Sequence, residues 1–313
     1  MPAARAAGRG EQLGFDELGL DEPGTDATGP AAGWARPLVR ITPARLAAWE
    51  GCPRRYRLTY VDRPAPPRGG PRAASTLGAV VHLALRALFA RPPDTRTAEV
   101  AAGLVDRNWS GEGFRDPAQE HEYRLRARGW VADYAAEALA PPGTCGTGPG
   151  PGDEPLGVER WVSAPVGGIV AEGRVDRIDA GPNGTAVVVD YKTGRRVPTP
   201  EDARDSAALA LYAVGAARTL RRPAHRVELH HLPSATVAAW THDETSLAAH
   251  VARAEQGALQ AADATEALAA GGDAEALFPP RPGPRCPSCD MRRHCPEGQR
   301  VGPQAPAWEG LAP

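Results

Sequence analysis

Residues 187–194, VVVDYKTG, limit the possible fold of this chain more than any other segment. Three consecutive valines favour a buried β-strand, because β-branched side chains pack well on a pleated sheet. Side chains in a strand alternate between its two faces, so Asp190 and Lys192 point to one face and Tyr191 to the other. A strand that begins in the core therefore ends by placing a carboxylate and an ammonium group on the same face.

A turn upstream of this strand indicates which residue lies opposite Asp190. The segment AGPNGT, residues 180–185, combines Gly, Pro and Asn-Gly, which is typical of a tight turn. If the turn is centred near Asn183, Asp176 lies opposite Asp190, with Cβ atoms about 4.5–5.5 Å apart. Two carboxylates so placed repel each other unless a positive group lies between them. Because hard divalent cations prefer oxygen ligands, the pattern predicts a Mg²⁺ or Mn²⁺ site, with Lys192 beside the metal's bound water.

The same residues also permit a purely structural interpretation. In that interpretation the two segments are edge strands with solvated polar faces, and Asp176 pairs with Arg174 or Arg177. The register of the strands decides between the two, because a slip of one residue moves every side chain to the opposite face. Both interpretations stay open on these residues alone.

The rest of the chain alternates between helical and strand-like patterns. Thr42 is a plausible N-cap, with Pro43 at the first helical position. Apolar spacing or composition predicts helices at residues 43–49, 75–90, 121–139, 203–219 and 246–270. Strand-like segments occur at residues 38–41, 158–166, 168–180, 185–194 and 225–232. This order predicts an α/β fold with a mixed sheet.

Composition divides the chain into one domain and its flanking segments. Residues 1–36 are rich in Ala, Gly and acidic groups and are expected to form a disordered N-terminal tail. Residues 37–299 are expected to form the domain, with a Pro/Gly-rich loop at 141–155. Residues 300–313 are expected to be a disordered C-terminal tail.

Charge and hydropathy exclude some classes of protein. The net charge of −2 excludes a uniformly basic coat for nucleic acid but permits a local basic channel. No apolar run approaches the roughly 18–20 residues of a membrane span, and the N-terminus lacks the apolar core of a secretory signal. A cytoplasmic location is therefore expected. Structural disulfides are uncommon in that compartment.

Four of the five cysteines form a candidate metal site. Cys286, Cys289 and Cys295 are spaced as C-x2-C-x5-C, and Cys52 lies more than two hundred residues upstream. Four thiolates can hold either a tetrahedral zinc ion or a [4Fe–4S] cluster. Closing so long a loop would stabilise the domain. Cys145, in the Pro/Gly-rich loop, is assigned no role.

Together these motifs resemble the PD-(D/E)XK nuclease superfamily, and specifically its RecB-like exonuclease branch. The segments GRVDRID, with Asp176, and VVDYKTG, with Asp190 and Lys192, are similar to the core of that family. The branch also carries G-x-x-x-H in an upstream helix, which Gly78 and His82 match. The resemblance covers roughly residues 38–295. It implies a restriction-endonuclease-like α/β core, with a central mixed sheet flanked by helices and with its ends stapled by an iron–sulfur cluster.

The resemblance implies a role for each matching residue. His82, Asp176 and Asp190 would bind Mg²⁺ or Mn²⁺, together with the backbone carbonyl of Tyr191. Lys192 would act in catalysis with the two aspartates. The four cysteines resemble the [4Fe–4S] site of the AddB nuclease domain and of CRISPR-associated RecB-like exonucleases, with zinc as the alternative occupant. The expected substrate-binding residues are three arginines near these motifs and one tyrosine: Arg54, Arg55, Arg195 and Tyr212.

One position departs from the family pattern. The family usually has Gln-x-x-x-Tyr in the helix after the lysine strand, whereas this chain has Ala208 and Tyr212 at those places. The missing amide puts the rate of reaction or the positioning of substrate in doubt. It does not remove a metal ligand.

The function implied is a metal-dependent DNA exonuclease that hydrolyses phosphodiester bonds at single-stranded ends during DNA repair or recombination. The alternative is a catalytically weakened DNA-end-binding module of a helicase–nuclease complex, and a third hypothesis is a zinc-stapled scaffold with no nucleic-acid role. The sequence contains no G-x-x-x-x-G-K-[ST] motif, so any unwinding would come from a partner such as a RecB- or AddA-like helicase.

Overall fold

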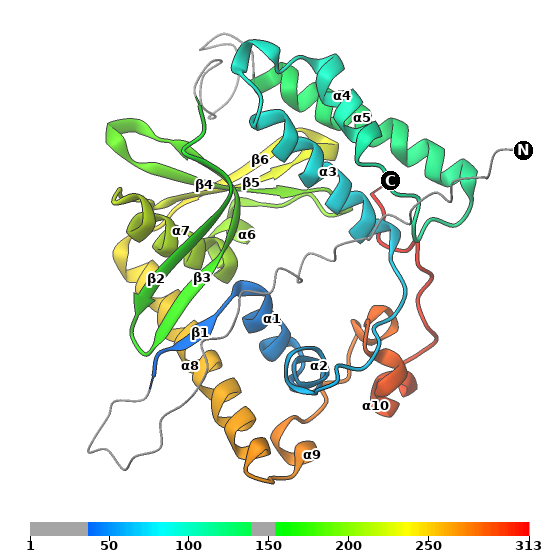
Figure 1. Cartoon of the computed structure of the whole chain (residues 1–313), viewed down its shortest axis with the longest axis vertical. Coiled ribbons are helices and arrows are strands. Elements are labelled where there is room, and N and C mark those ends of the chain that lie inside the picture. Colours follow the sequence, from blue (N-terminus) through cyan, green and yellow to red (C-terminus); the bar gives the residue numbers. More distant parts are fainter. Residues whose placement is uncertain (1–36, 139–153, 313) are drawn as a thin grey trace, which may run out of the picture. The chain divides into compact units, whose positions relative to one another are not determined.

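The computed structural model describes residues 37–138 and 154–312 (Figure 1). The expected tail at 1–36 and almost all of the expected loop at 141–155 lie outside these residues. The described residues build a six-stranded mixed sheet with helices on both faces. This arrangement confirms the predicted α/β class.

Strand β3 (Ile169–Ala180) organises one half of the sheet. It pairs along most of its length with antiparallel β2 (Gly157–Val166). Its opposite edge pairs with parallel β1 (Val39–Ile41) as far as residue 171, and with antiparallel β4 (Ala186–Lys192) from residue 177 onward. On that edge, residues 172–176 of β3 therefore make no regular strand pairing among the described residues. Asp176 lies at the end of this gap.

The other half of the sheet extends from β4. Strand β5 (Arg226–His231) pairs with it in parallel, and β6 (Thr236–Thr241) pairs antiparallel with β5. Strand β6 was not predicted from the sequence, because its segment TVAAWT is short and follows a turn closely.

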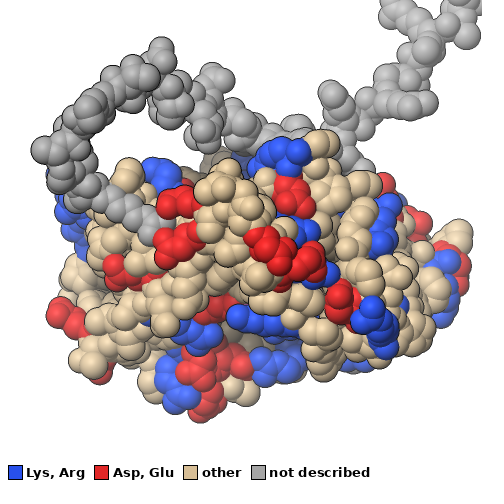
Figure 2. Space-filling model, turned by 90° about the horizontal axis from the view of Figure 1, so that it is seen from below, with Lys and Arg blue, Asp and Glu red and all other residues tan. Residues whose placement is uncertain are grey.

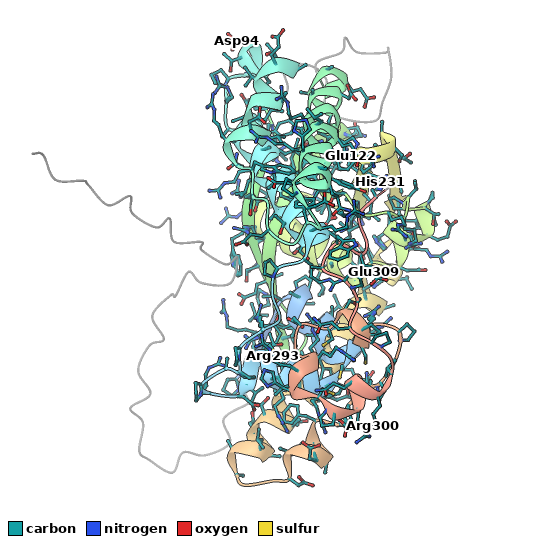
Figure 3. The ribbon with its side chains drawn as sticks, turned by 90° about the vertical axis from the view of Figure 1, so that its right-hand side faces the viewer. Asp94, Glu122, His231, Arg293, Arg300 and Glu309 are labelled. Atoms are coloured by element: carbon teal, nitrogen blue, oxygen red, sulfur yellow. The ribbon has the colours of Figure 1, made fainter. Side chains whose placement is uncertain are left out.

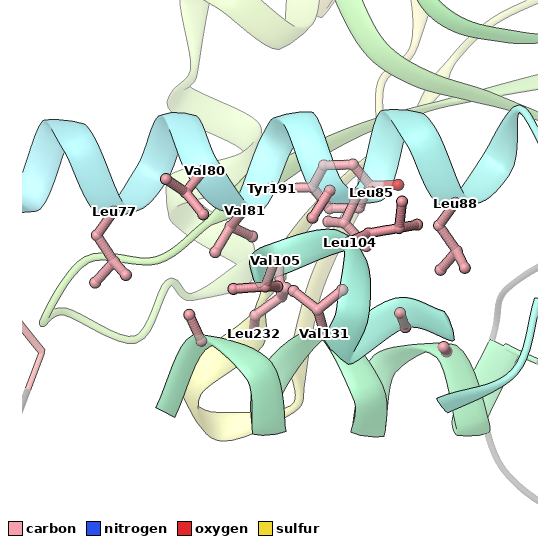
Figure 4. Packing of buried hydrophobic residues seen from close by; sticks show 14 of the residues in the cluster. Leu77, Val80, Val81, Leu85, Leu88, Leu104, Val105, Val131, Tyr191 and Leu232 are labelled. Atoms are coloured by element: carbon pink, nitrogen blue, oxygen red, sulfur yellow. The ribbon is translucent and has the colours of Figure 1, made fainter. Parts of the chain in front are cut away.

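One face of the sheet is covered by α3 (Ala73–Phe89), α4 (Ala98–Arg107) and α5 (Pro117–Ala138). Figure 4 shows Val81 and Leu85 of α3 packing with Val105 of α4 and Val131 of α5. The ring of Tyr191, from β4, belongs to the same buried cluster. Since α3 carries His82, this packing fixes the distance between that imidazole and the sheet.

The opposite face is covered mainly by α7 (Ala207–Leu220). The sequence predicted one helix over 203–219, but α6 (Pro200–Asp205) and α7 are separate. The helix breaks at Ser206, whose backbone is extended and whose hydroxyl accepts a hydrogen bond from the backbone N–H of Leu209. A serine N-cap thus starts a second helix inside the predicted one.

The remaining helices frame the two ends of the domain. Helix α1 (Pro43–Gly51) begins at the predicted cap, since the Thr42 hydroxyl accepts a hydrogen bond from the backbone of Arg45. The others are α2 (Pro53–Tyr56), α8 (Glu244–Ala269), α9 (Ala274–Leu277) and α10 (Pro296–Arg300). Across the described residues, no helix combines the length and the apolar character needed to cross a membrane.

The segment 301–312, expected from composition to be disordered, packs against the body of the protein. Leu311 and Ala312 are only 4% and 2% exposed. Leu311 forms a β-bridge with Gly194, and the Tyr123 hydroxyl donates to the carbonyl of Ala312 at 2.5 Å. Figure 3 shows the ribbon rising from the region of Arg300 past Glu309. The C-terminal segment therefore connects the region of the clustered cysteines to the loop just beyond Lys192.

Candidate active site

Two of the predicted metal ligands face each other across strands β3 and β4. Arg177 pairs with Val189, and continuing this register by one residue places Asp176 opposite Asp190. This is the alignment expected from the turn near residue 183. The regular ladder stops there, because the Asp176 carboxylate, rather than a backbone carbonyl, accepts the hydrogen bond from the N–H of Tyr191, at 3.0 Å.

A third carboxylate, which the sequence analysis missed, extends this row onto β2. Val158 and Arg160 pair with residues 177 and 175 of β3, which leaves Glu159 opposite Asp176. Glu159 has a φ of 48°, in the left-handed region. A non-glycine residue there costs on the order of 1–2 kcal/mol and persists only where its surroundings hold it. Glu159 therefore holds a strained backbone conformation at the position opposite Asp176.

His82 approaches this row from helix α3. Its Nδ1 lies 3.3 Å from Oδ1 of Asp176, and its Nε2 lies 3.2 Å from the carbonyl oxygen of Tyr191. When Nε2 donates to that carbonyl, the lone pair of Nδ1 faces the carboxylates, which is the tautomer that a metal ligand needs. The backbone of Tyr191 thus orients both His82 and Asp176.

These residues make a group that could bind a metal ion. His82, Glu159 and Asp176 each offer a ligand atom, and the three atoms lie within 4.8 Å of one another. One imidazole and two carboxylates suit a hard or borderline divalent cation such as Mg²⁺ or Mn²⁺. No other group of this kind occurs among the described residues.

Asp190, predicted as a metal ligand, stands outside this close group. Its carboxylate forms an ion pair with the ammonium group of Lys192, two residues further along the same strand. The pairing follows from the alternation noted in the sequence, which places both side chains on one face. Asp190 is nevertheless close enough to Asp176 and His82 for their charges to act on its ionisation.

Burial and mutual repulsion shift the ionisation of this cluster. Burial raises the pKa of Asp190, and Lys192 only partly opposes it while Asp176 adds to it. Burial likewise raises the pKa of Glu159, against the opposing charge of Arg174, whose Nε lies 2.7 Å from the Glu159 carboxylate. Burial lowers the pKa of His82, but the hydrogen bond and charge of Asp176 outweigh burial, and the net shift is upward. The site is therefore short of positive charge.

Tyr212 lies against the same region from helix α7. A Cβ atom at Gly173 would lie 2.7 Å from Cε1 of the tyrosine ring, so only glycine fits at that position of β3. Burial raises the pKa of Tyr212, and the charges of Asp190 and Asp176 add to the shift. Ala208 precedes Tyr212 by one turn on α7, and its methyl group offers no hydrogen bond. The role of Tyr212 as a substrate contact stays a prediction.

A buried polar network lies beneath the ring of Tyr191. The Arg177 guanidinium donates to the Tyr191 hydroxyl at 3.2 Å and to Asp179 at 3.0 Å. The hydroxyl of Tyr134 is 2.7 Å from Nδ1 of His230. Burial raises the pKa of Tyr134 to about 12, so this hydroxyl is a donor. Breaking a buried ion pair on one side is costly, so the network holds Tyr191, and with it the site, in one position.

The predicted substrate-binding arginines already have partners. Arg54 is only 5% exposed and pairs with Glu275 and with Glu297, the latter at 2.8 Å. A DNA phosphate would have to displace these carboxylates. Arg55 pairs with Asp290 at 2.8 Å, and Nε of Arg195 donates to the carbonyl of Leu311 at 3.2 Å.

The surface charge supports no broad basic channel on one side of the molecule. On the face shown in Figure 2, basic side chains are interspersed with aspartate and glutamate. Any attraction of this face for a phosphodiester backbone would be local, because neighbouring opposite charges cancel at distances beyond about 8–10 Å.

The four predicted cluster ligands line one cavity of about 770 Å³. Three of the sulfurs accept backbone hydrogen bonds: Cys52 from Arg281, Cys286 from Gly283, and Cys295 from Gly298, at 3.3–3.4 Å. Thiolates are ligands both of zinc and of iron–sulfur clusters, so the arrangement suits either occupant.

Glu159 could have been found from the sequence by the reasoning that paired the aspartates. The Gly167–Gly168 pair marks the turn between β2 and β3, since residues 166 and 169 are partners. Counting outward from that turn places Glu159 opposite Asp176. The signal was missed because Val-Glu-Arg-Trp-Val has the polar alternation of an ordinary solvated strand.

Comparisons with known proteins identify the family of this chain. Residues 40–296 match the family model of the PD-(D/E)XK nuclease superfamily, and the chain belongs to that superfamily. Nucleases of this superfamily use divalent metal ions, and DNA is the substrate that such a domain implies. Among curated proteins, none matches significantly. A solved structure from Eubacterium rectale, described provisionally as an exonuclease, is 9% identical, with a TM-score of 0.46 over 82% of this chain and 88% of its own.

Metal binding to His82, Glu159 and Asp176 should depend on pH in a defined direction. A protonated imidazole cannot coordinate, so below the raised pKa of His82 each bound ion must displace a proton. We expect the affinity for Mn²⁺ to rise with pH, by up to about tenfold per unit for one displaced proton, and to level off above the ordinary histidine pKa of about 6.5. Calorimetric titration in buffers of different ionisation enthalpy measures both the affinity and the proton release. An affinity independent of pH, or one that levels off below that value, would contradict this assignment, and His82→Gln should remove the proton release.

Proposed function

We propose that this protein is a metal-dependent deoxyribonuclease that acts as an exonuclease. The observation that supports it best is the convergence of His82, Glu159 and Asp176, within 4.8 Å of one another, on a strand edge that also carries Asp190 and Lys192. This constellation has the ligand types for a divalent cation and a lysine beside them. Membership of the PD-(D/E)XK superfamily makes phosphodiester hydrolysis the reaction that this geometry serves.

Each residue has a defined task in this proposal. His82, Glu159 and Asp176 would hold Mg²⁺ or Mn²⁺, with Asp190 as a further ligand once its carboxylate leaves Lys192. Bound there, the cation would lower the pKa of a coordinated water and polarise the scissile phosphate. Lys192, released from Asp190, would stabilise the charge that develops on the phosphate oxygens. The carbonyl of Tyr191 would orient His82 or contribute directly as a ligand.

Single-stranded ends, in DNA repair or recombination, are the proposed substrate. Support comes from the sequence motifs shared with the RecB-like branch, GRVDRID, VVDYKTG and the upstream Gly78–His82 pair. The chain has no nucleotide-binding motif of the Walker type. We therefore propose that a RecB- or AddA-like helicase supplies single strands when the substrate is duplex.

A second function is favoured by one observation. Ala208, at the position where the family usually has Gln, faces the region of Tyr212 without any hydrogen-bonding group. A chain that binds DNA ends beside a helicase but cleaves them slowly would fit this loss. The complete set of metal ligands and Lys192 argue for the active enzyme.

We propose that the four cysteines hold a [4Fe–4S] cluster, with zinc as the alternative. Support comes from the backbone N–H donors to three of the sulfurs, which stabilise thiolates, and from the distribution of the ligands, with three clustered cysteines and one remote cysteine. A bound cluster would cross-link the end of α1, at Cys52, to the C-terminal segment that carries Cys286, Cys289 and Cys295. It would act as a structural staple.

Substitution of the catalytic residues tests the nuclease proposal. Asp190→Asn and Lys192→Ala should each lower the rate of cleavage of labelled single-stranded DNA in Mn²⁺ by at least about 10²–10³-fold. The first removes a carboxylate ligand of the cation, and the second removes a positive charge that would stabilise the phosphate oxygens in the transition state. Glu159→Gln should act in the same direction. Binding of the same DNA should change far less.

Asp205→Asn is the matched control, because Asp205 is an exposed carboxylate paired only locally with Arg204. It should leave the rate unchanged. Cleavage by Asp190→Asn at the rate of the unaltered protein would overturn the assignment. Absence of cleavage by the unaltered protein, with DNA binding retained, would favour the end-binding function.

The colour and metal content of the purified protein test the proposal of a [4Fe–4S] cluster. Protein purified without oxygen should be brown and contain about four irons per chain. Cys52→Ser should lose the iron and lower the melting temperature, because the long loop is no longer closed. Cys145→Ser, which alters a cysteine outside the candidate site, is the control and should keep both properties. A colourless protein containing one zinc ion would contradict the proposal.

A further inference from the structure

One large aromatic side chain lies exposed beside the candidate active site. Trp161, on β2, is 54% exposed. Isolated exposed apolar residues are common and by themselves indicate no function. Trp161 differs from such residues because it lies close to the carboxylates of the candidate active site.

Trp161 lies on the same face of the sheet as the site. It is directly opposite Arg174 of β3 in the register, and side chains of opposed residues share a face. Arg174 in turn contacts the Glu159 carboxylate at 2.7 Å. Glu159 lies within 4.8 Å of His82 and Asp176, measured between ligand atoms. A continuous line of side chains therefore runs from the metal ligands through Arg174 to the indole.

The spacing suits a nucleic-acid strand. Two residues along a β-strand separate Trp161 from Glu159, which is about 7 Å. Successive phosphates of one strand lie about 3.4 Å apart along a duplex axis and farther apart when the strand is extended. A strand whose scissile phosphate lies at the metal ligands would therefore bring a base one or two nucleotides away to the indole.

An exposed indole at this position suits an unpaired base rather than a base pair. Aromatic side chains stack on bases of any sequence, but only where the base face is not already covered by its neighbours in a duplex. The Arg174 side chain, about one-third exposed and paired with Glu159, lies at the edge of this surface. Electrostatic attraction to the backbone and stacking on the base are the combination by which single strands are bound.

We infer that Trp161 is a stacking platform for an unpaired nucleobase of the DNA strand being cleaved, and that it makes the site prefer single-stranded over duplex substrate. This inference rests on the proposed nuclease function and adds a substrate-binding residue to it. The occupant is a nucleobase close to the scissile phosphate, and the contact requires no particular base.

The test compares binding to intact and abasic DNA. The Asp190→Asn protein binds a fluorescently labelled thymidine oligonucleotide without cleaving it, and anisotropy gives the affinity. Adding Trp161→Ala should weaken binding about tenfold, equivalent to about 1.4 kcal/mol. Trp161→Phe keeps an aromatic face and should lose much less.

An abasic nucleotide is then moved through the oligonucleotide. At one position the abasic nucleotide should weaken binding about tenfold in the protein that retains Trp161. In the Trp161→Ala variant the same nucleotide should cause no further loss, because the indole that stacks on the base is already absent. Trp308→Ala, at another partly exposed tryptophan in the C-terminal segment, is the matched control and should bind as the unaltered protein does. Melting temperatures confirm that each variant is folded.

The outcomes separate this inference from the function on which it rests. If Trp161→Ala binds as tightly as the unaltered protein, or if its loss is the same at every abasic position, the stacking platform is wrong even where metal-dependent cleavage is observed. If the abasic effect depends on Trp161 but the unaltered protein cleaves no DNA, the stacking contact is supported and the nuclease function is wrong.

Discussion

Repulsion between carboxylates on adjacent strands is the constraint on which the site depends. Glu159, Asp176 and Asp190 occupy one row across β2, β3 and β4, at the separation of about 5 Å that opposed strand residues share. Such a row destabilises a sheet unless positive charge compensates it. His82 and Lys192 supply part of that charge, and a divalent cation would supply the rest. The same row that weakens the sheet thus creates affinity for a metal ion.

The fold opposes this repulsion by fixing the strand that carries Tyr191. The backbone N–H and carbonyl of Tyr191 engage Asp176 and His82, while its hydroxyl accepts a hydrogen bond from Arg177 in the buried network. The apolar packing of α3 against β4 sets the height of His82 above the sheet. Residues 301–312, which pair with Gly194, tie the end of this strand to the segment that bears the cysteines. Stability of the core and geometry of the site therefore share the same contacts.

Local chemistry made part of this arrangement predictable. The Asn-Gly turn set the register of Asp176 with Asp190, and Thr42 with Pro43 marked the start of α1, because both signals act over a few residues. Glu159 was not predicted, although counting from the Gly167–Gly168 turn reaches it, because its segment has the polar alternation of an ordinary solvated strand. The order of residues 301–312 was not predicted either, because Leu311 gains its burial from a core cluster and a β-bridge whose other residues lie far away in the sequence.

The most direct measurement is the location of a bound cation. Crystals of the protein soaked in Mn²⁺ and measured at the manganese absorption edge reveal the ion by its anomalous scattering. We expect a peak in contact with His82, Glu159 and Asp176, with metal–oxygen distances of about 2.0–2.4 Å, and with Asp190 turned from Lys192 toward the ion. A protein that cleaves DNA in Mn²⁺ but binds the ion elsewhere, with these carboxylates unoccupied, would contradict the shared site.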